Sequence, residues 1–326
     1  MYQLQMSGAL LERVRNLFLI KKYPTDRTVF AFNIANWKRE FLKSCFPDKR
    51  FHFLSLKRPF EKYIDKISRA KNPLFLIWGG EEPPSLLAYS KQNGIQIARI
   101  EDGFLRSVGL GAEHRLPRSL CIDYSGIYYN ARVPSDLENI LQTYDFSNDL
   151  DLMIEARNCL VQILEHKLTK YNLGQTEMAP NLYGPKSKRR ILVIGQIEDD
   201  QSVVYGCDSL VTNNDLVRIA YEENPDAQII YKVHPEIIAG FRPNMSNPHD
   251  VGSIAHLIGQ PMSIDDAIVG VDQVYTISSL AGFECLLRGK RVTTIGCPFY
   301  SGWGVTDDRQ NNVRRTRKLT IDESIF

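Results

Sequence analysis

The sequence predicts an α/β protein in which parallel β-sheets are covered by helices on both faces, and three observations support this fold class. Short apolar runs alternate with helical patterns along the 326 residues of the chain. Turn signals separate the runs from the helical patterns, as expected for strand, helix, strand units. The composition, 43% hydrophobic and 24% charged, is typical of a globular protein, and the length suits two domains.

Seven apolar runs are the expected strands, and two segments illustrate the helices between them. The segment "SLLAYSKQNG" ends in a glycine stop, and "SLAGFECLLRGK" ends at Gly289 with basic residues in its last turn. The expected strands are "TVFAFNI", "NPLFLIWGG", "IQIARIEDG", "RRILVIGQ", "AQIIYKVHP", "QVYTISS" and "RVTTIG".

A change in pattern near residue 185 predicts a domain boundary. Residues 136–171 have a helical, charged pattern, and the next segment, "LGQTEMAPNLYGPKSKRR", is rich in glycine, proline and polar residues. We therefore expect a Rossmann-like N-terminal domain at residues 1–185 and a Rossmann-like C-terminal domain at residues 186–326. The parallel sheets of the two domains are expected to face each other across a cleft.

Bulk composition argues against several classes of protein. The net charge of +2 gives no support to nucleic-acid binding. The six cysteines contain no CxxC pair, which favours reduced, mostly buried thiols in the cytoplasm over disulfides or a zinc site. There is no secretory signal pattern and no run of 18 apolar residues, so neither secretion nor membrane spanning is expected. The basic clusters "KSKRR" and "RRTRK" are either solvated surface or contacts to an anionic membrane surface.

Polar residues gather where the expected strands end. In open parallel sheets the carboxyl ends of the strands form the ligand crevice, because variable loops and helix N-termini meet there. The most acidic exit is "GQIEDD", in which Glu198, Asp199 and Asp200 follow a buried strand. Either these carboxylates cap the next helix, or one of them takes part in chemistry.

The exits "YKVHPE" and "TISSLAGFE" carry groups suited to an anion. Lys232 and His234 lie two residues apart on one face, a basic pair that either holds a phosphate or is structural. Ser278 and Ser279 stand where a helix begins and either bind the same anion or act as plain N-caps. Glu284, further along that helix, could accept hydrogen bonds from ribose hydroxyls. No GxGxxG or GKS/T pattern supports a dinucleotide or P-loop site.

Two further segments offer contacts to a sugar. In "RIEDGFLRS", Arg106 and Ser107 could bind a carboxylate, or the segment is a turn in which Glu101 or Asp102 forms a local salt bridge. Trp303 lies between two glycines and is either an apolar platform for a sugar or a packing residue.

Taken together, these strings resemble a known family. "EDG", "HP" and "SS" occur in this order in bacterial CMP-sugar transferases of the GT-B type. The longer strings "EDGFLRSVGLG", "SLCIDYSGIYYN", "YKVHPEI", "GFECLLRGK" and "PFYSGWGVTDD" resemble more specifically the KpsC-like β-Kdo transferase modules of capsule polysaccharide biosynthesis. The resemblance runs from about residue 74 to residue 319 and implies a GT-B-type fold with two Rossmann-like domains.

The resemblance implies a retaining glycosyltransferase that moves Kdo, an eight-carbon acid sugar, from CMP-β-Kdo to a saccharide acceptor. Retention calls for two displacements or an equivalent front-face route, and the resemblance implies two displacements, of which the first forms a covalent sugar adduct on an aspartate. The family-like pattern fits Gln196, Asp200, Ser202 and Tyr205, which makes Asp200 the nucleophile and Asp199 the second choice.

The same resemblance assigns the remaining roles. Glu101 or Asp102 is the acid/base carboxylate, and His234 meets the departing CMP phosphate. No cofactor or essential metal is expected, because a CMP-sugar carries one phosphate rather than a diphosphate. The expected donor contacts are Gln196, Lys232, His234, Pro235, Ser278, Ser279 and Glu284, and the expected sugar contacts are Arg106, Ser202, Tyr205 and Trp303.

Two alternatives stay open at this point. One is an inverting CMP-sialic-acid-type transferase with the same nucleotide motifs and no nucleophile; the other is a non-catalytic module that binds polysaccharide or assists export. KpsC-like proteins usually carry two modules, so this chain is a stand-alone module, an excised half or a single-module relative. The expected acceptor is a lipid-linked oligosaccharide, which places the protein in the cytoplasm, peripherally at the inner membrane, with no nucleic-acid partner.

Overall fold

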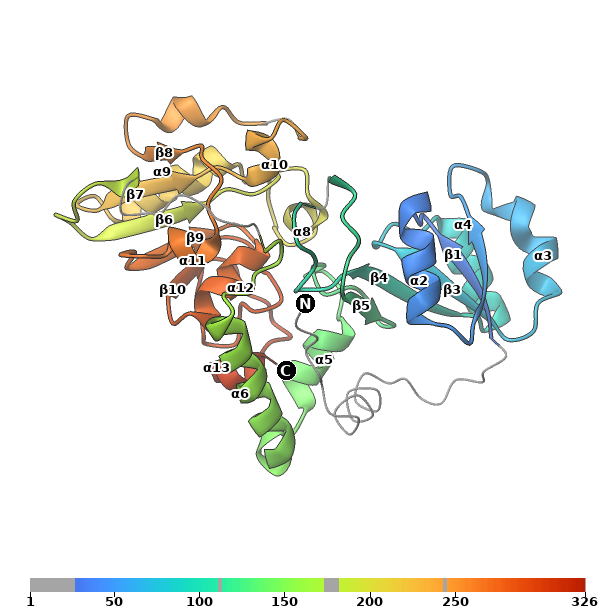
Figure 1. Ribbon diagram of the computed structural model, residues 1–326. Helices are drawn as coiled ribbons and strands as arrows, with labels where there is room; N and C mark the ends of the chain where they lie inside the picture. The colour runs from blue at the N-terminus through green and yellow to red at the C-terminus, as the bar shows by residue number, and fades with distance from the viewer. Residues whose placement is uncertain (1–26, 111–112, 173–181, 243–244, 326) are drawn as a thin grey trace. The chain divides into compact units, whose positions relative to one another are not determined.

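The computed structural model describes residues 27–110, 113–172, 182–242 and 245–325 (Figure 1). The chain divides into two compact units, one up to Arg99 and one from Ile100 onward. The described strands form one sheet of five strands and one of six. Every strand pair whose register is defined runs parallel. The predicted α/β class with two mainly parallel sheets is therefore confirmed.

The five-stranded sheet has the order β2-β1-β3-β4-β5. Strand β1 (Thr28–Phe32) pairs in parallel with β2 (Arg50–Leu54) and with β3 (Pro73–Trp78). Strands β4 (Gln96–Asp102) and β5 (Leu120–Asp123) complete the order. All five residues of β1 are buried, as expected for an apolar run that has a strand on each side.

Short helices accompany the strands of the first unit. Phe30, Phe32 and Phe75 pack together with Leu86 of α4 in one apolar cluster. Helix α4 ends at Gly94, which adopts the left-handed conformation with φ of 62°, so the predicted glycine stop is confirmed. The helices of this unit are η1 (Asn36–Lys38), α2 (Arg39–Cys45), η2 (Phe60–Tyr63), α3 (Ile64–Ser68) and α4 (Pro84–Asn93).

The six-stranded sheet has the order β11-β10-β9-β6-β7-β8. Its strands are β6 (Arg190–Ile194), β7 (Gln228–Lys232), β8 (His256–Ile258), β9 (Gln273–Thr276), β10 (Arg291–Thr294) and β11 (Asp307–Asp308). The helices of the second unit are α5 (Asp136–Thr143), η4 (Phe146–Asn148), α6 (Leu150–Glu165), α8 (Gln201–Val204), α9 (Asn213–Glu223), α10 (Pro235–Ile238), η5 (Pro248–Val251), α11 (Ile264–Ala267), α12 (Leu280–Leu287) and α13 (Ile321–Ser324).

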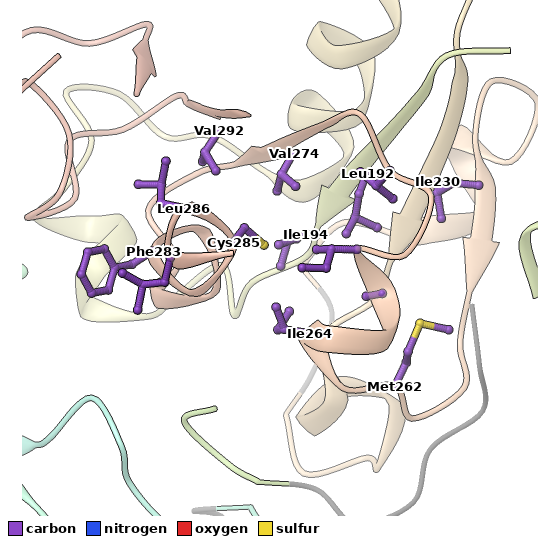
Figure 2. Close-up of a cluster of buried hydrophobic side chains, with 14 of the residues drawn as sticks. Leu192, Ile194, Ile230, Met262, Ile264, Val274, Phe283, Cys285, Leu286 and Val292 are labelled. Atoms are coloured by element: carbon purple, nitrogen blue, oxygen red, sulfur yellow. The ribbon is translucent and has the colours of Figure 1, made fainter. Parts of the chain in front are cut away.

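Alternate residues of β6 enter two different cores. Leu192 and Ile194 pack with residues of α11 and α12 on one face (Figure 2). Ile191 and Val193 pack with residues of α9 on the other face. Since successive side chains of a strand point to opposite faces, β6 must be apolar throughout, as the sequence shows. The parallel arrangement also brings the carboxyl ends of β6, β7 and β9 to the same edge of the sheet.

All seven expected strands are present, and four others were not predicted. Strands β8 and β11 have three and two residues, too short to show a period. Strands β2 and β5 are mostly half-buried rather than apolar throughout, so they lack the pattern that identified the central strands.

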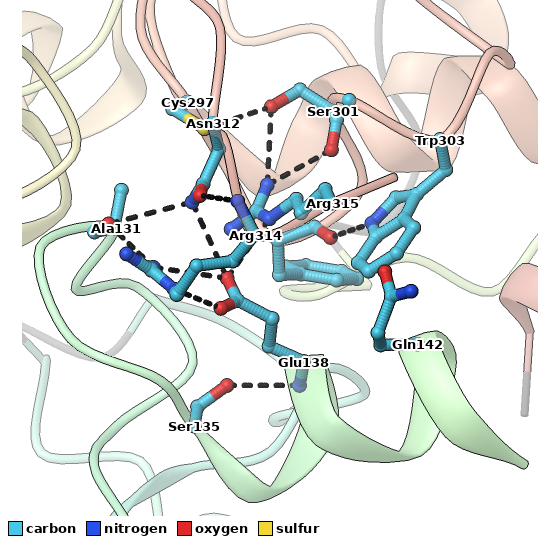
Figure 3. Close-up of polar contacts among 12 residues, drawn as sticks. Ala131, Ser135, Glu138, Gln142, Cys297, Ser301, Trp303, Asn312, Arg314 and Arg315 are labelled. Atoms are coloured by element: carbon cyan, nitrogen blue, oxygen red, sulfur yellow. Dashed lines mark hydrogen bonds and ion pairs between the residues drawn. The ribbon is translucent and has the colours of Figure 1, made fainter. Parts of the chain in front are cut away.

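The C-terminal segment returns to helices α5 and α6. The Glu138 carboxylate accepts from Arg314 Nε at 2.5 Å and from Arg315 Nε at 2.9 Å (Figure 3). A surface ion pair of 2.6 Å between Arg157 and Asp322 lies further along. These contacts join residues 138–157 to residues 314–322 within the second unit.

The contacts of Glu138 explain why the compact units differ from the expected domains. The expected boundary near residue 185 lies inside the second unit, whereas the units divide after Arg99. Residues 138–157 fold against the end of the chain, and only a tertiary structure shows such an association.

Part of each basic cluster is engaged within the protein, and contact of the exposed part with an anionic surface stays a prediction. Arg314 and Arg315 bind Glu138, and Arg317 donates to the Tyr144 carbonyl. Arg190 is 4% exposed and donates to Gln228 Oε1. Of the eight basic residues, Arg190 and Arg315 are buried, whereas Lys186, Lys188, Arg189 and Lys318 are exposed.

Two further expectations concern the burial of the cysteines and the absence of membrane-spanning helices. All six cysteines are free; Cys207, Cys285 and Cys297 are buried, whereas Cys45 and Cys159 are exposed, so the expected burial holds for only part of the set. Among the described residues, no helix has the length and apolar character to cross a membrane.

Candidate active site

The three acids that follow β6 have different environments, and Glu198 is structural. Its side chain is 4% exposed and accepts hydrogen bonds from the N–H groups of Asn213 and Met245. The N–H and the hydroxyl of Ser246 donate to the same carboxylate. Four donors use the capacity of a carboxylate, so Glu198 fastens the β6 exit to two other segments.

Asp199 and Asp200 are both exposed, but they differ in their contacts. Asp199 forms a surface ion pair with Arg242, 2.7 Å long. Asp200 is the N-cap of α8: its Oδ1 accepts from the N–H and the hydroxyl of Ser202 at 2.8 and 2.6 Å. Among the described residues no donor is recorded for Asp200 Oδ2. Asp200 therefore caps a helix with one oxygen and keeps the other accessible.

A buried amide joins the ends of β6 and β9. The Gln196 Nε2 group donates to the hydroxyls of Ser202 and Ser278, at 2.8 and 3.1 Å. Its Oε1 accepts from the Ser278 N–H, and the Ser278 hydroxyl donates to the Ser202 carbonyl. Gln196 is 5% exposed and Ser278 6% exposed. These two residues therefore position the loop that carries Asp200, and their direct contact with the donor stays a prediction.

Helix α12 begins beside this network. The Ser279 Oγ accepts from the Ala281 N–H at 3.2 Å, so the N-cap interpretation of Ser279 is confirmed. The Tyr300 hydroxyl donates to the Ser279 carbonyl, and a Cβ at Gly282 would lie 2.3 Å from that hydroxyl. Glycine is therefore required at position 282 for Tyr300 to support the start of α12.

His234 is held as a neutral imidazole. It is the N-cap of α10, with Pro235 as the first helical residue, and its Nδ1 accepts from the Glu236 N–H at 3.2 Å. Burial lowers the pKa of His234 to about 3, and the charges of Lys232, Lys170 and Arg242 contribute in the same direction. Because Nδ1 is an acceptor, the ring proton is on Nε2, which can donate to an anion.

Lys232, two residues before His234, and Glu284 are both buried. Burial lowers the pKa of Lys232 to about 8, against the opposing effect of Glu284. Burial raises the pKa of Glu284 to about 7, although the Lys170 N–H and the charge of Arg288 lower it. Glu284 Oε1 accepts from the Lys170 N–H at 2.6 Å. One oxygen of Glu284 thus has a structural role, and the ribose contact stays a prediction.

The β4 exit contains the local salt bridge that was one of the two interpretations. Arg106 is 3% exposed, and its Nε donates to Asp102 Oδ2 at 2.6 Å. Its Nη1 donates to the Ser107 hydroxyl and to the Arg115 carbonyl. Arg106 is therefore not available to a sugar carboxylate, which corrects that expectation. The Asp102 carboxylate is engaged as well, and Glu101 Oε1 accepts from the Asp102 N–H at 3.0 Å.

Trp303 is not a sugar platform. It is fully buried, its Nε1 donates to the Phe299 carbonyl at 2.8 Å, and the Arg315 guanidinium lies 5.6 Å from the ring centroid. The indole packs with Leu141, Phe146 and Leu319, so the packing interpretation is correct. Tyr205, by contrast, is half-buried beneath the Arg132 guanidinium, 5.3 Å from its ring centroid.

Two residues that the sequence did not single out connect the β4 and β6 exits. The charges of Glu101 and Asp200 both raise the pKa of the Tyr128 hydroxyl, after burial, the largest cause. Glu101 and Asp200 also raise the pKa of Lys170, as does Tyr171, whereas burial lowers this pKa. The two candidate carboxylates therefore share a neighbourhood in the second unit. In the sequence, Lys170 belongs to the charged helical pattern of residues 136–171, and nothing in that pattern distinguishes it from a surface lysine.

In the part of the chain that the structure describes, no group of three or more His, Cys, Asp or Glu side chains is arranged to hold a metal ion. The independence of the reaction from metal stays a prediction.

Polar groups gather at the carboxyl ends of the parallel strands, the edge at which open α/β sheets commonly bind ligands. The family model described as "Capsule polysaccharide biosynthesis protein" matches residues 75–172 and 150–326. The chain belongs to this family. Among curated relatives, it is 43% identical to the lipopolysaccharide-processing protein LpsZ of Rhizobium meliloti over 90% of this chain and 67% of LpsZ. It is 36% identical to the capsule polysaccharide modification protein LipA of Neisseria meningitidis serogroup B over 97% of this chain, but only 44% of LipA.

Two solved structures of Thermosulfurimonas dismutans KpsC are similar to this chain. The β-Kdo 2,4 transferase structure has a TM-score of 0.75 and 32% sequence identity. The β-Kdo 2,7 transferase structure has a TM-score of 0.70 and 29% identity. Each comparison covers 91% of this chain and 88% of the KpsC chain. The family-level resemblance predicted from the motifs is confirmed.

Proposed function

We propose that this chain is a retaining glycosyltransferase that moves Kdo from CMP-β-Kdo to a saccharide acceptor of a capsule or related surface polysaccharide. Family membership and the similarity to the two KpsC β-Kdo transferase structures support the class of reaction. The proposed acceptor is a lipid-linked oligosaccharide that carries the Kdo linker.

The observation that carries the mechanism is the environment of Asp200. Its Oδ1 is fixed by Ser202, while Oδ2 has no recorded donor among the described residues, and the side chain is exposed. In the proposed first step, Oδ2 attacks the anomeric carbon of Kdo and the bond from that carbon to the phosphate oxygen breaks. The electron pair leaves with CMP, and a glycosyl ester forms on Asp200.

Departure of CMP requires stabilisation of the phosphate charge. His234 can supply a neutral Nε2–H donor, and the positive end of the α12 helix dipole lies at Ser279. Lys232 is 5% exposed, so we assign it the role of raising the local positive potential rather than direct contact.

The second step needs a base for the acceptor hydroxyl. Glu101 is the better candidate, because the Asp102 carboxylate is paired with Arg106. Glu101 takes the proton of the acceptor hydroxyl as its oxygen attacks the anomeric carbon and Asp200 is released. Two inversions at one carbon give net retention.

Intact-protein mass spectrometry with freshly generated CMP-β-Kdo tests the proposal. The wild type should gain the mass of one Kdo residue and release CMP, and Asp200→Ala should gain none. Asp199→Ala is the matched control, because it removes the neighbouring exposed carboxylate and should keep the adduct. EDTA should leave CMP release unchanged.

The alternatives give different results. An inverting transferase would keep most of its activity in Asp200→Ala and show no adduct in the wild type. A wild type that neither binds nor cleaves CMP-β-Kdo would instead indicate a non-catalytic polysaccharide-binding or export module.

A further inference from the structure

Lys170 is a cation at the candidate active site with no assigned role. The residue is half-buried and follows α6. The recorded contact of its ammonium is with the Tyr171 ring, whose centroid lies 5.3 Å away. Among the described residues, none forms an ion pair or a hydrogen bond with Nζ. A charged group withdrawn from water without a direct partner is costly, which points to a ligand that completes its contacts.

The backbone of Lys170 is fixed by two parts of the site. Its N–H donates to Glu284 Oε1 at 2.6 Å. Its carbonyl accepts from the N–H groups of Arg106 and Ser107, at 3.0 and 3.1 Å. The ammonium therefore extends from a point that is tied both to α12 and to the β4 exit. Such a position is suited to a substrate contact, because the backbone of Lys170 is already ordered and loses little conformational entropy on binding.

The Lys170 charge interacts with the proposed nucleophile Asp200 and with His234 at the proposed leaving-group site. Burial lowers the pKa of Lys170. The charges of four neighbouring groups raise this pKa by more than burial lowers it, so the net shift is upward; these groups are Tyr171, Asp200, Glu101 and Asp102. The ammonium is charged at neutral pH. Its charge in turn contributes to the low pKa of His234.

We propose that the Lys170 ammonium binds the carboxylate of the donor sugar. The inference rests on the proposed function, since it takes Kdo as the donor sugar. In Kdo the carboxylate is attached to the anomeric carbon, so it must lie beside Asp200 when that residue attacks. The two negative groups repel each other, and a cation between them offsets the repulsion. Arg106, the other basic residue of this region considered for the role, is already paired with Asp102.

The test compares a ligand that has the carboxylate with one that lacks it. CMP-β-Kdo carries the carboxylate and CMP does not. Loss of a charged hydrogen bond in Lys170→Met should raise KM for CMP-β-Kdo roughly 10- to 100-fold, with the inhibition constant of CMP changed less than about twofold. Lys170→Arg, which keeps the charge, should recover most of the loss. Lys167→Met is the matched control, because it removes an exposed lysine from the same segment.

The results separate this inference from the proposed function. An unchanged KM in Lys170→Met, or an equal loss of affinity for CMP, overturns the role of Lys170 while the wild type still forms the adduct. A wild type that forms no adduct and releases no CMP overturns the proposed function itself. Lys170→Gln is measured in parallel, with the melting temperature of each variant, so that the comparison does not depend on the folding of a single protein.

Discussion

The Asp102 carboxylate and the Arg106 guanidinium form a buried ion pair in which Oδ2 and Nε lie 2.6 Å apart. The pair occupies the turn after β4, and both side chains are largely withdrawn from solvent, with 15% and 4% exposed. This ion pair distinguishes Asp102 from Glu101, two adjacent acids that the sequence motif did not distinguish. Asp102 holds the turn, and Glu101 is the candidate for chemistry.

Removal of the Asp102 charge should destabilise the protein. In Asp102→Asn the Arg106 guanidinium stays buried without its counter-charge, which costs about 3 kcal/mol of unfolding free energy. Urea unfolding followed by circular dichroism measures the loss. A change below about 0.5 kcal/mol, the range of ordinary surface substitutions, would show that the pair is not structural.

Glu101→Gln should affect turnover and leave stability close to that of the wild type. Without the base, attack by the acceptor hydroxyl slows by about 100-fold or more, while the first displacement continues. The adduct on Asp200 should therefore accumulate in the presence of both donor and acceptor, as seen in intact mass spectra. Rapid transfer with no accumulation would return the base role to another group.

Glu138 should be essential for docking the C-terminal segment. Its carboxylate binds Arg314 and the buried Arg315, whose side chain is 2% exposed (Figure 3). Glu138→Ala leaves that charge uncompensated and should cost about 3 to 5 kcal/mol in denaturant unfolding. The control is Asp322→Asn, which breaks the exposed pair with Arg157 and should cost less than about 1 kcal/mol. Equal losses in the two variants would contradict the assignment.

His234 should make stability depend on pH on the acidic side. Its pKa is about 3 in the folded protein and 6.5 as the ordinary value, so between these pH values the unfolded chain binds more protons. The stability contribution of the neutral ring is therefore complete above pH 6.5 and is lost as the pH falls toward 3. Unfolding of the wild type and of His234→Gln over this range measures the contribution.

The imidazole itself can be followed by NMR. Its resonances should show no titration near pH 6.5 in the free protein. Addition of CMP should raise the pKa, because a phosphate beside Nε2 favours the protonated ring. A titration near pH 6.5 without CMP would show that the ring is solvated and not held as described.

The sequence pattern predicted the central strands and helix ends because these elements depend on residues that are close together in the sequence. Buried parallel strands need continuous apolar runs, and the run that forms β6 shows this directly. The helix stop at Gly94 follows from the left-handed conformation that glycine adopts without strain. The position of the site at strand exits also follows, because parallel strands end at one edge of their sheet.

The sequence by itself determined the fold class, the family and the strand ends at which the site lies. Only the tertiary structure decided which polar groups are used up inside the protein. Arg106 and Trp303 are attractive sugar contacts by residue type, yet one is paired with Asp102 and the other is buried. Partners such as Glu284 and Lys170, 114 residues apart, are brought together by packing, and no local pattern records that contact. Accessibility and the choice of partner are properties of the folded chain: Glu198 is buried, Asp199 pairs with Arg242, and Asp200 caps α8 with one oxygen.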